Sequence, residues 1–222
     1  MKKAFLAFCC AGFAFVAQAG HPFNTLGSVL VGDGEVEVIA SAGTDFSGGG
    51  DVDVDVGITY GIGERFNIGL ENAWAINKKD KDTRGFDTPG LFMQFSLIPD
   101  VLSIAGSSAL NGGEFGSALV YTLALESETE LNFNAGFESN GNDENAFSYS
   151  FSVIQAIQSL FVGAEIYGSA YKDTEDKPFW QIGVGYGFEN SLILSVGFGG
   201  SFKTNDDLAI TLGCTFVFGG GE

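Results

Sequence analysis

Carboxylates are the side chains in this chain whose type and spacing could do chemistry. Asp51, Asp53 and Asp55 stand at every second position and alternate with valines, which would place all three carboxylates on one face of a strand. Carboxylates held close together can transfer protons or attract cations. The same residues resemble the start of a calcium loop, but the signal is poor, because the sixth position of that loop needs glycine and is Val56 in this chain.

Nucleophilic and metal chemistry lack the residues that they need. The only histidine, His21, precedes every segment that we expect to be a strand, and a catalytic serine needs a histidine within hydrogen-bond reach. Beyond residue 19, Cys214 is the only cysteine, so the chain offers no cysteine–histidine spacing for a metal. We therefore expect no catalytic residue, no metal site and no cofactor. An enzyme that uses paired carboxylates is the weakest alternative.

The elements that would position the carboxylates are β-strands. Apolar residues alternate with small or polar residues about a dozen times, for example over 52–62 and 208–218. This period of two is that of a strand with one apolar face, which a soluble sandwich packs inside and an outer-membrane barrel turns to lipid. We expect twelve strands, at residues 35–46, 51–61, 65–76, 90–98, 101–110, 116–126, 129–138, 146–155, 159–170, 179–188, 191–203 and 207–218.

Three features favour the membrane barrel. Tight turns alternate with long polar loops, as they do in outer-membrane barrels. Only 17% of the residues are charged, against about 25% in soluble domains. None of the eight basic residues beyond residue 19 lies in the middle of an expected strand; they are Arg65, Lys78, Lys79, Lys81, Arg84, Lys172, Lys177 and Lys203. The sequence therefore predicts an all-β fold, a transmembrane antiparallel up-and-down β-barrel of about 12 strands, or of ten if one weak hairpin over 90–110 is merged.

The chain divides into three expected parts. Residues 1–19 have the features of a signal peptide, because Lys2 and Lys3 precede an uncharged apolar run that ends at the small-residue cleavage site Ala17–Ala19. Residues 20–33 form an N-terminal segment, which is either a plug inside the barrel or a periplasmic tail. Residues 34–222 form the barrel, which we expect in the bacterial outer membrane.

Aromatic residues are expected to form two belts where the barrel meets the lipid–water interfaces. Trp74 and Trp180 fall near the external ends of their strands. The aromatic residues near the periplasmic ends are Tyr60, Phe66, Phe95, Phe188 and Phe218. The alternative is that these aromatic side chains fill a soluble core.

The inward faces of the expected strands carry acids and no lysine or arginine. Such carboxylates must be hydrated, protonated or paired with a bound cation, and hydration implies a wet interior. The candidate residues for solute binding in the lumen are Asp45, Asp53, Asp55, Glu71, Glu126, Glu138, Glu165 and Tyr167.

Turn lengths would bring several of these acids together on the external half of the barrel. A three-residue loop within 61–65 would place Asp55 opposite Glu71, and a tight connection over 46–50 would stack Asp45, Asp51 and Asp53 beside them. Such a cluster would attract cations or amine-bearing solutes. The alternative is an ordinary solvated mouth.

Two segments resemble the outer-membrane "MetA-pathway of phenol degradation" transporter family. The first is His21-Pro22-Phe23-Asn24-Thr25, followed by the glycine-rich stretch Gly32–Glu37, and the second is Thr59–Ile68, in which a Tyr-Gly-aliphatic turn carries an acidic–arginine pair. The chain departs from the family after Thr25, where Leu26-Gly27-Ser28 replaces the usual acidic pair. The resemblance implies an outer-membrane barrel that moves aromatic or other small compounds.

Charge and architecture together define the expected partners. A formal net charge of -18 excludes nucleic-acid binding through phosphates. We expect contacts with outer-membrane lipid and lipopolysaccharide, with the barrel-assembly machinery, and with small solutes, including cations. The favoured function is a channel or transporter for small solutes with an acidic, cation-preferring lumen. The alternative is a structural or surface-binding barrel with a closed lumen that acts through external loops.

Overall fold

The structure is a computed structural model, which describes residues 23, 26–46, 52–75, 85–86, 88–139, 145–171, 178–188, 192–203 and 208–219. Residues 1–19, the expected signal peptide, lie outside this part of the chain. Every regular element that the structure describes is a strand. The strands are β1 (Glu35–Asp45), β2 (Val52–Ile62), β3 (Phe66–Ala75), β4 (Gly85–Phe86), β5 (Gly90–Ile98), β6 (Leu102–Ala109), β7 (Phe115–Ala124), β8 (Thr129–Ser139), β9 (Asn145–Ile157), β10 (Leu160–Tyr171), β11 (Phe179–Phe188), β12 (Leu192–Ser201) and β13 (Ala209–Gly219).

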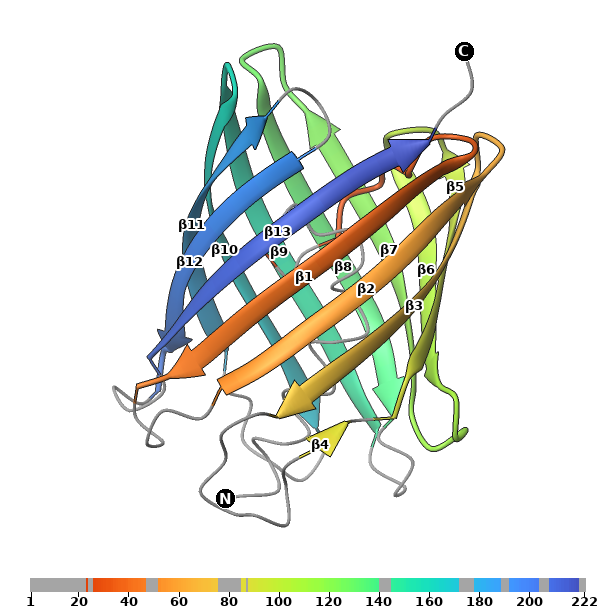
Figure 1. Cartoon of the computed structure of the whole chain (residues 1–222), viewed down its shortest axis with the longest axis vertical. Coiled ribbons are helices and arrows are strands. Elements are labelled where there is room, and N and C mark those ends of the chain that lie inside the picture. Colours follow the sequence, from red (N-terminus) through yellow and green to blue (C-terminus); the bar gives the residue numbers. More distant parts are fainter. Residues whose placement is uncertain are drawn as a thin grey trace.

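Twelve of these strands close into one antiparallel barrel (Figure 1). Each strand pairs with the next along the chain, and β1 pairs with both β2 and β13, which closes the ring. Closure leaves no barrel strand with an unpaired edge, so the backbone groups of the wall are satisfied within the sheet. The prediction of a 12-stranded, up-and-down antiparallel barrel is confirmed.

The remaining strand, β4, extends β5 rather than adding a strand to the ring. Both pair with β3, where Trp74 lies opposite Phe86 and Glu71 lies opposite Gly90. On β3, two residues separate Glu71 from Trp74, whereas three residues separate their partners Phe86 and Gly90. One extra residue on one side of a strand pair is the mark of a β-bulge. Pro89 lies in this interval, where the absence of an N–H group costs no ladder hydrogen bond. The hairpin of β5 and β6 is present, so ten strands is the wrong alternative.

Short turns connect the strands at one end of the barrel. Asp100, Glu128 and Gln158 have φ values of 59°, 58° and 59°, the left-handed backbone conformation that many tight hairpin turns require. At the other end, β1 and β2 are separated by residues 46–51 and β3 and β5 by residues 76–89. The predicted alternation of short and long connections is therefore present.

One predicted register is wrong. The loop between β2 and β3 is Gly63–Arg65, because Ile62 pairs with Phe66. Gly63 supplies the positive φ of 61° in this turn, so the loop begins one residue later than expected. The shift moves Asp55 opposite Ala73, and Glu71 opposite Gly57. Asp55 and Glu71 are therefore diagonal neighbours on the inner face rather than a directly opposed pair.

Side chains alternate between an exposed outer face and an inner face. On β7, for example, Leu119 and Tyr121 are exposed while Val120 between them is fully buried. Most large apolar side chains of the outer face are exposed, which would be costly in water and is typical of a wall that faces lipid. No helix among the described residues is long and apolar enough to cross a membrane.

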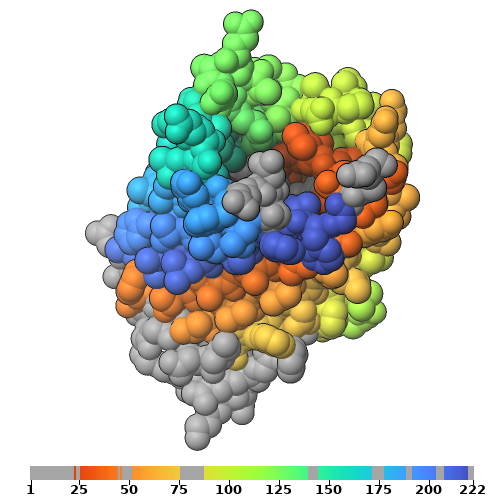
Figure 2. All heavy atoms as spheres, turned by 45° about the horizontal axis from the view of Figure 1, so that its top comes forward, coloured from red at the N-terminus to blue at the C-terminus, as the bar shows by residue number. Residues whose placement is uncertain are grey.

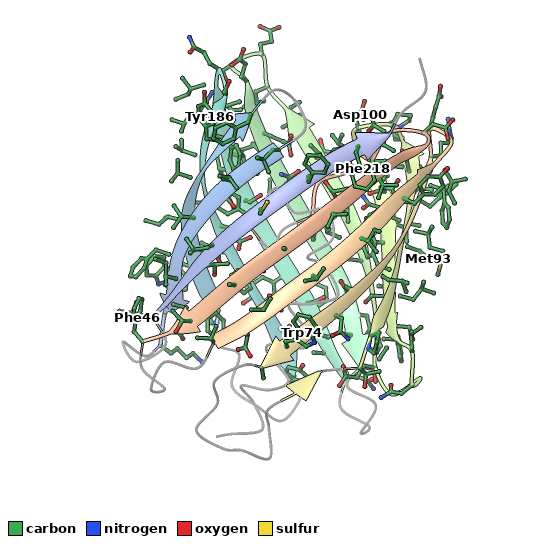
Figure 3. All side chains as sticks on the ribbon, in the orientation of Figure 1. Phe46, Trp74, Met93, Asp100, Tyr186 and Phe218 are labelled. Atoms are coloured by element: carbon green, nitrogen blue, oxygen red, sulfur yellow. The ribbon has the colours of Figure 1, made fainter. Side chains whose placement is uncertain are left out.

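The aromatic residues expected in two belts lie toward the ends of the strands. Trp74 lies at the long-loop end and Phe218 at the short-turn end (Figure 3). Trp180, the second residue of β11, lies at the long-loop end and packs edge-on against Phe198 at a ring-centroid distance of 5.7 Å. The residues toward the short-turn end are Tyr60, Phe66, Phe95, Phe188 and Phe218. That they contact lipid interfaces stays a prediction.

Candidate functional site

The lumen of the barrel contains the described part of the N-terminal segment. Leu26 is fully buried against Phe92, Ala105 and Val120, which point inward from β5, β6 and β7. Burying a leucine side chain contributes about 1.5–3 kcal/mol, so this contact holds the segment against one side of the wall. Figure 2 shows the short-turn end of the barrel, with the red segment that precedes β1 inside the ring of strands.

Phe23 anchors the segment on another part of the wall. The side chain is 99% removed from solvent, and its Cζ atom lies 2.7 Å from the position that a Cβ on Gly163 of β10 would occupy. A larger residue at 163 would therefore collide with the phenyl ring. The segment thus contacts β10 as well as the β5–β7 side of the lumen.

Hydrogen bonds with polar wall residues hold the segment directly after Leu26. The side-chain amide of Gln94 on β5 donates to the carbonyl oxygen of Gly27 at 3.0 Å. The backbone N–H of Ser28 donates to Oγ1 of Thr122 on β7 at 2.8 Å, and that hydroxyl donates to Oδ1 of Asn132 on β8 at 2.6 Å. These bonds satisfy backbone groups that would otherwise be buried without partners.

The segment leaves the lumen at the short-turn end and continues into β1. The carbonyl oxygens of Val31 and Gly32 lie so close to Gly61 of β2 that a Cβ there would collide with both. The N–H of Gly34 donates to the carbonyl oxygen of Gly61 at 3.1 Å, and the N–H of Gly63 donates to Oδ1 of Asp33 at 2.6 Å. Only glycine at position 61 permits this crossing.

Acidic residues line the adjacent part of the wall, on β1, β2 and β3. Asp53, Asp55 and Glu71 point inward and are partly accessible, as predicted from the alternation. The hydroxyl of Ser41 on β1 donates to Oδ2 of Asp55 at 3.1 Å. The oxygens Oδ1 of Asp55, Oε2 of Glu71 and Oε1 of Glu37 are buried and accept no hydrogen bond from the described residues. Buried carboxylate oxygens without donors favour a cation or water as their partner.

The remaining acidic candidates have different positions. Glu138 on β8 and Glu165 on β10 are buried on the inner face, and the Tyr171 hydroxyl donates to Oε1 of Glu138 at 3.1 Å. Glu126 was expected in the lumen, but β7 ends at Ala124 and Glu126 lies exposed in the following turn. The strand ends before the alternation reaches it, so its assignment to the lumen wall is wrong.

The expected stack of Asp45, Asp51 and Asp53 beside Asp55 stays a prediction. The last described pair of these two strands is Thr44 opposite Val52, and residues 47–51 lie outside the described part of the chain. Asp51 and the side chain of Asp45 lie outside the described part of the chain. Asp53 lies opposite Gly43 and Asp55 opposite Ser41.

Tyr167 lies on the inner face of β10, directly opposite Phe179 of β11. The two rings are nearly parallel, with centroids 5.8 Å apart and planes inclined by 20°. Both side chains are partly accessible. They form an aromatic surface close to the long-loop end, four residues before the end of β10 and at the first residue of β11.

Several residues that hold the N-terminal segment were not singled out in the sequence. Gln94, Thr122 and Gly163 have no local signal that distinguishes them from other inward polar or small residues. Their role depends on a segment that reaches them from distant sequence positions. No group of acidic, histidine or cysteine residues in the described ranges has a geometry that could hold a metal ion.

Comparisons with known proteins support the fold. The KdgM porin has a TM-score of 0.65 at 10% identity, with 82% of this chain and 99% of that chain covered; KdgM has also been solved in complex with disordered oligogalacturonate. The NanC porin has a TM-score of 0.59 at 9% identity over 81% and 98% of the two chains. The COG4313 outer membrane channel from Pseudomonas putida F1 has a TM-score of 0.56 at 10% identity over 86% and 98%.

No protein-family model matches the chain, and no curated protein matches its sequence. Membership of the MetA-pathway family therefore stays a prediction. At identities near one residue in ten, the structural similarity concerns the arrangement of the strands. The chain shares the closed, 12-stranded antiparallel barrel fold of these outer-membrane porins and channels.

Proposed function

We propose that this protein is an outer-membrane channel for small solutes, with a lumen that prefers cations and is narrowed by its own N-terminal segment. The observation that carries this proposal is the charge of the inner wall. Within the described strands, carboxylates point into the lumen while neither Lys nor Arg does; the two described basic residues, Arg65 and Lys203, lie exposed outside the strands. A channel lined by one sign of charge concentrates ions of the opposite sign.

Location in the outer membrane is supported by the outer face of the barrel. Its exposed side chains are large and apolar along nearly every strand, as a lipid-facing wall requires. Closed barrels and helices are the structures that satisfy their backbone hydrogen bonds within a bilayer. We accordingly propose outer-membrane lipid, including lipopolysaccharide at the external leaflet, as the surroundings of the barrel.

Space for solutes is supported by the uneven lining of the lumen. The described contacts of Leu26, Gly27 and Ser28 are with β5, β7 and neighbouring strands. On the opposite stretch of wall, Gly183, Gly197 and Gly199 occupy inward positions in the middle of β11 and β12, while the ring of Phe161 lies against Gly185. The proposed path for solutes runs between this glycine-rich wall, the acids of β1–β3 and the N-terminal segment.

The N-terminal segment also favours a second candidate, a barrel whose lumen is closed and whose external loops carry the function. Phe23 and Leu26 are almost completely buried, and side chains that fill the space inside the ring would support a closed lumen. The two candidates differ in whether solutes cross the barrel. A transport measurement therefore separates them directly.

Liposome swelling with sugars of similar size and different charge is the test. The mature protein is reconstituted, and the rates are compared for glucosamine, glucose and galacturonate at equal osmolarity and neutral pH. The proposed channel predicts the order glucosamine, glucose, galacturonate, from fastest to slowest. A preference for galacturonate would contradict the acidic lumen, and swelling no faster than protein-free liposomes would favour the closed barrel.

A further inference from the structure

The acids of β2 and β3 face an aromatic surface across the lumen. Along the ring, five strands (β5 to β9) lie between β3 and β10, and four (β1, β13, β12 and β11) lie between β2 and β10. Tyr167 on β10 is therefore nearly diametrically opposite Asp55 and Glu71. All three point inward, so the two groups line the lumen from opposite walls.

Both groups also lie at the same end of the barrel. Asp55 is the fourth residue of β2 and Glu71 lies four residues before the end of β3, while Tyr167 lies four residues before the end of β10. Phe179, which pairs with Tyr167, is the first residue of β11. Each position thus lies in the half of its strand nearest the long-loop end, which is the external end of an outer-membrane barrel.

The chemistry of the two groups is complementary to one class of solute. Aromatic faces attract cations, and quaternary ammonium groups are the ligands that such surfaces recognise most often. Oδ1 of Asp55 and Oε2 of Glu71 are buried oxygens with no hydrogen-bond donor among the described residues, so a nearby positive charge would stabilise them. A solute with an apolar body and a fixed positive charge would satisfy both walls.

We propose that the external half of the lumen is a selectivity site for organic cations, formed by Tyr167 and Phe179 on one wall and by Asp55 and Glu71 on the other. This inference rests on the proposed channel function and adds the class of solute. The described strands offer no basic side chain to bind an acidic sugar such as oligogalacturonate, the compound in the KdgM complex. The site would instead distinguish ammonium compounds with an apolar body both from neutral solutes and from K⁺.

Block of single-channel K⁺ current by choline tests the site. The matched probe is 3,3-dimethylbutan-1-ol, which has the shape of choline without its charge. Added to the external side in symmetrical KCl, choline should reduce the current in a saturating manner, and the alcohol should have little effect. Equal block by both compounds, or no block by choline, would overturn the proposal. The K⁺ current recorded before either compound is added tests the channel function separately.

Substitutions assign the effect to the two walls. Tyr167→Leu with Phe179→Leu keeps apolar volume and removes both rings, and should raise the half-blocking choline concentration about three- to tenfold, the size expected of a cation–π contact. The control Tyr186→Leu changes an exposed tyrosine on the outer face of β11 and should leave block unchanged. Asp55→Asn with Glu71→Gln should weaken block as well. Block that survives the loss of both rings would refute the aromatic half of the site.

Discussion

Single residues decide whether the N-terminal segment stays in the lumen. Leu26 is completely buried between side chains of three strands, and truncating such a leucine costs about 2–5 kcal/mol. We predict that Leu26→Ala releases the segment part of the time and increases single-channel conductance or the frequency of high-conductance openings. The barrel should remain folded, because its wall is paired independently of the segment.

The matched control for this prediction lies in the same segment. Val29 is 52% exposed, so Val29→Ala removes apolar volume without removing a buried contact and should leave conductance unchanged. Folding of both variants is checked by the heat-dependent shift in gel mobility that folded barrels show. Unchanged conductance in a folded Leu26→Ala variant would mean that the segment does not obstruct the path.

Residue positions within strands could be predicted from the sequence, but contacts made by the N-terminal segment could not. Alternation with valines is sufficient to turn Asp53 and Asp55 to the inner face. Glu126 shows where this reasoning fails, because side chains alternate between the inner and outer faces only within the strand, and β7 ends at Ala124. The bond from Gln94 to Gly27 joins residues 67 positions apart, and no local pattern specifies such a partner.

At the scale of elements, the tight turns are the places where the backbone departs from its preferred conformation. Gln158, exposed between β9 and β10, has a φ of 59°, which costs a residue with a Cβ about 1–2 kcal/mol and costs glycine much less. We predict that Gln158→Gly raises the free energy of unfolding by about 1 kcal/mol, measured by urea titration in lipid vesicles.

A β-branched residue provides the opposite test of this turn. Gln158→Val should lower the free energy of unfolding, because valine tolerates positive φ worse than glutamine does. If glycine and valine shifted the urea midpoint in the same direction, backbone conformation would not be the cause.

The strands themselves could be predicted, whereas one register could not. Expected and observed bounds differ by only a residue or two at most ends, as for 179–188 and β11 (Phe179–Phe188), because period-two alternation continues along the whole strand. Register between β2 and β3 depends on which residue begins the turn. The glycines at 61 and 63 both allow a positive φ, and the structure uses Gly63, which shifts the pairing of Asp55 from Glu71 to Ala73.

At the scale of the whole molecule, the two faces of the wall should respond oppositely to charge. Leu212 and Thr211 are neighbours on β13; Leu212 is 58% exposed on the outer face, and Thr211 lies on the inner face. A lysine on a lipid face costs about 2–4 kcal/mol at the midplane. We predict that Leu212→Lys lowers the free energy of unfolding in bilayers by about 2 kcal/mol.

The inner neighbour serves as the comparison in the same assay. Thr211→Lys places the same charge in the lumen, where water and the acids of β1–β3 can solvate it, so it should cost much less and should reduce cation preference. Equal destabilisation by both lysines would contradict a lipid-facing outer wall.

The central claim is that ions cross an acidic lumen, and reversal potential measures this most directly. Folded mature protein is inserted into a planar bilayer, and single-channel current is recorded under a KCl gradient. The predicted result is a set of discrete current steps whose reversal potential has the sign expected of a cation-selective channel. Reversal on the anion side, or no steps from protein shown to be folded and inserted, would contradict the account.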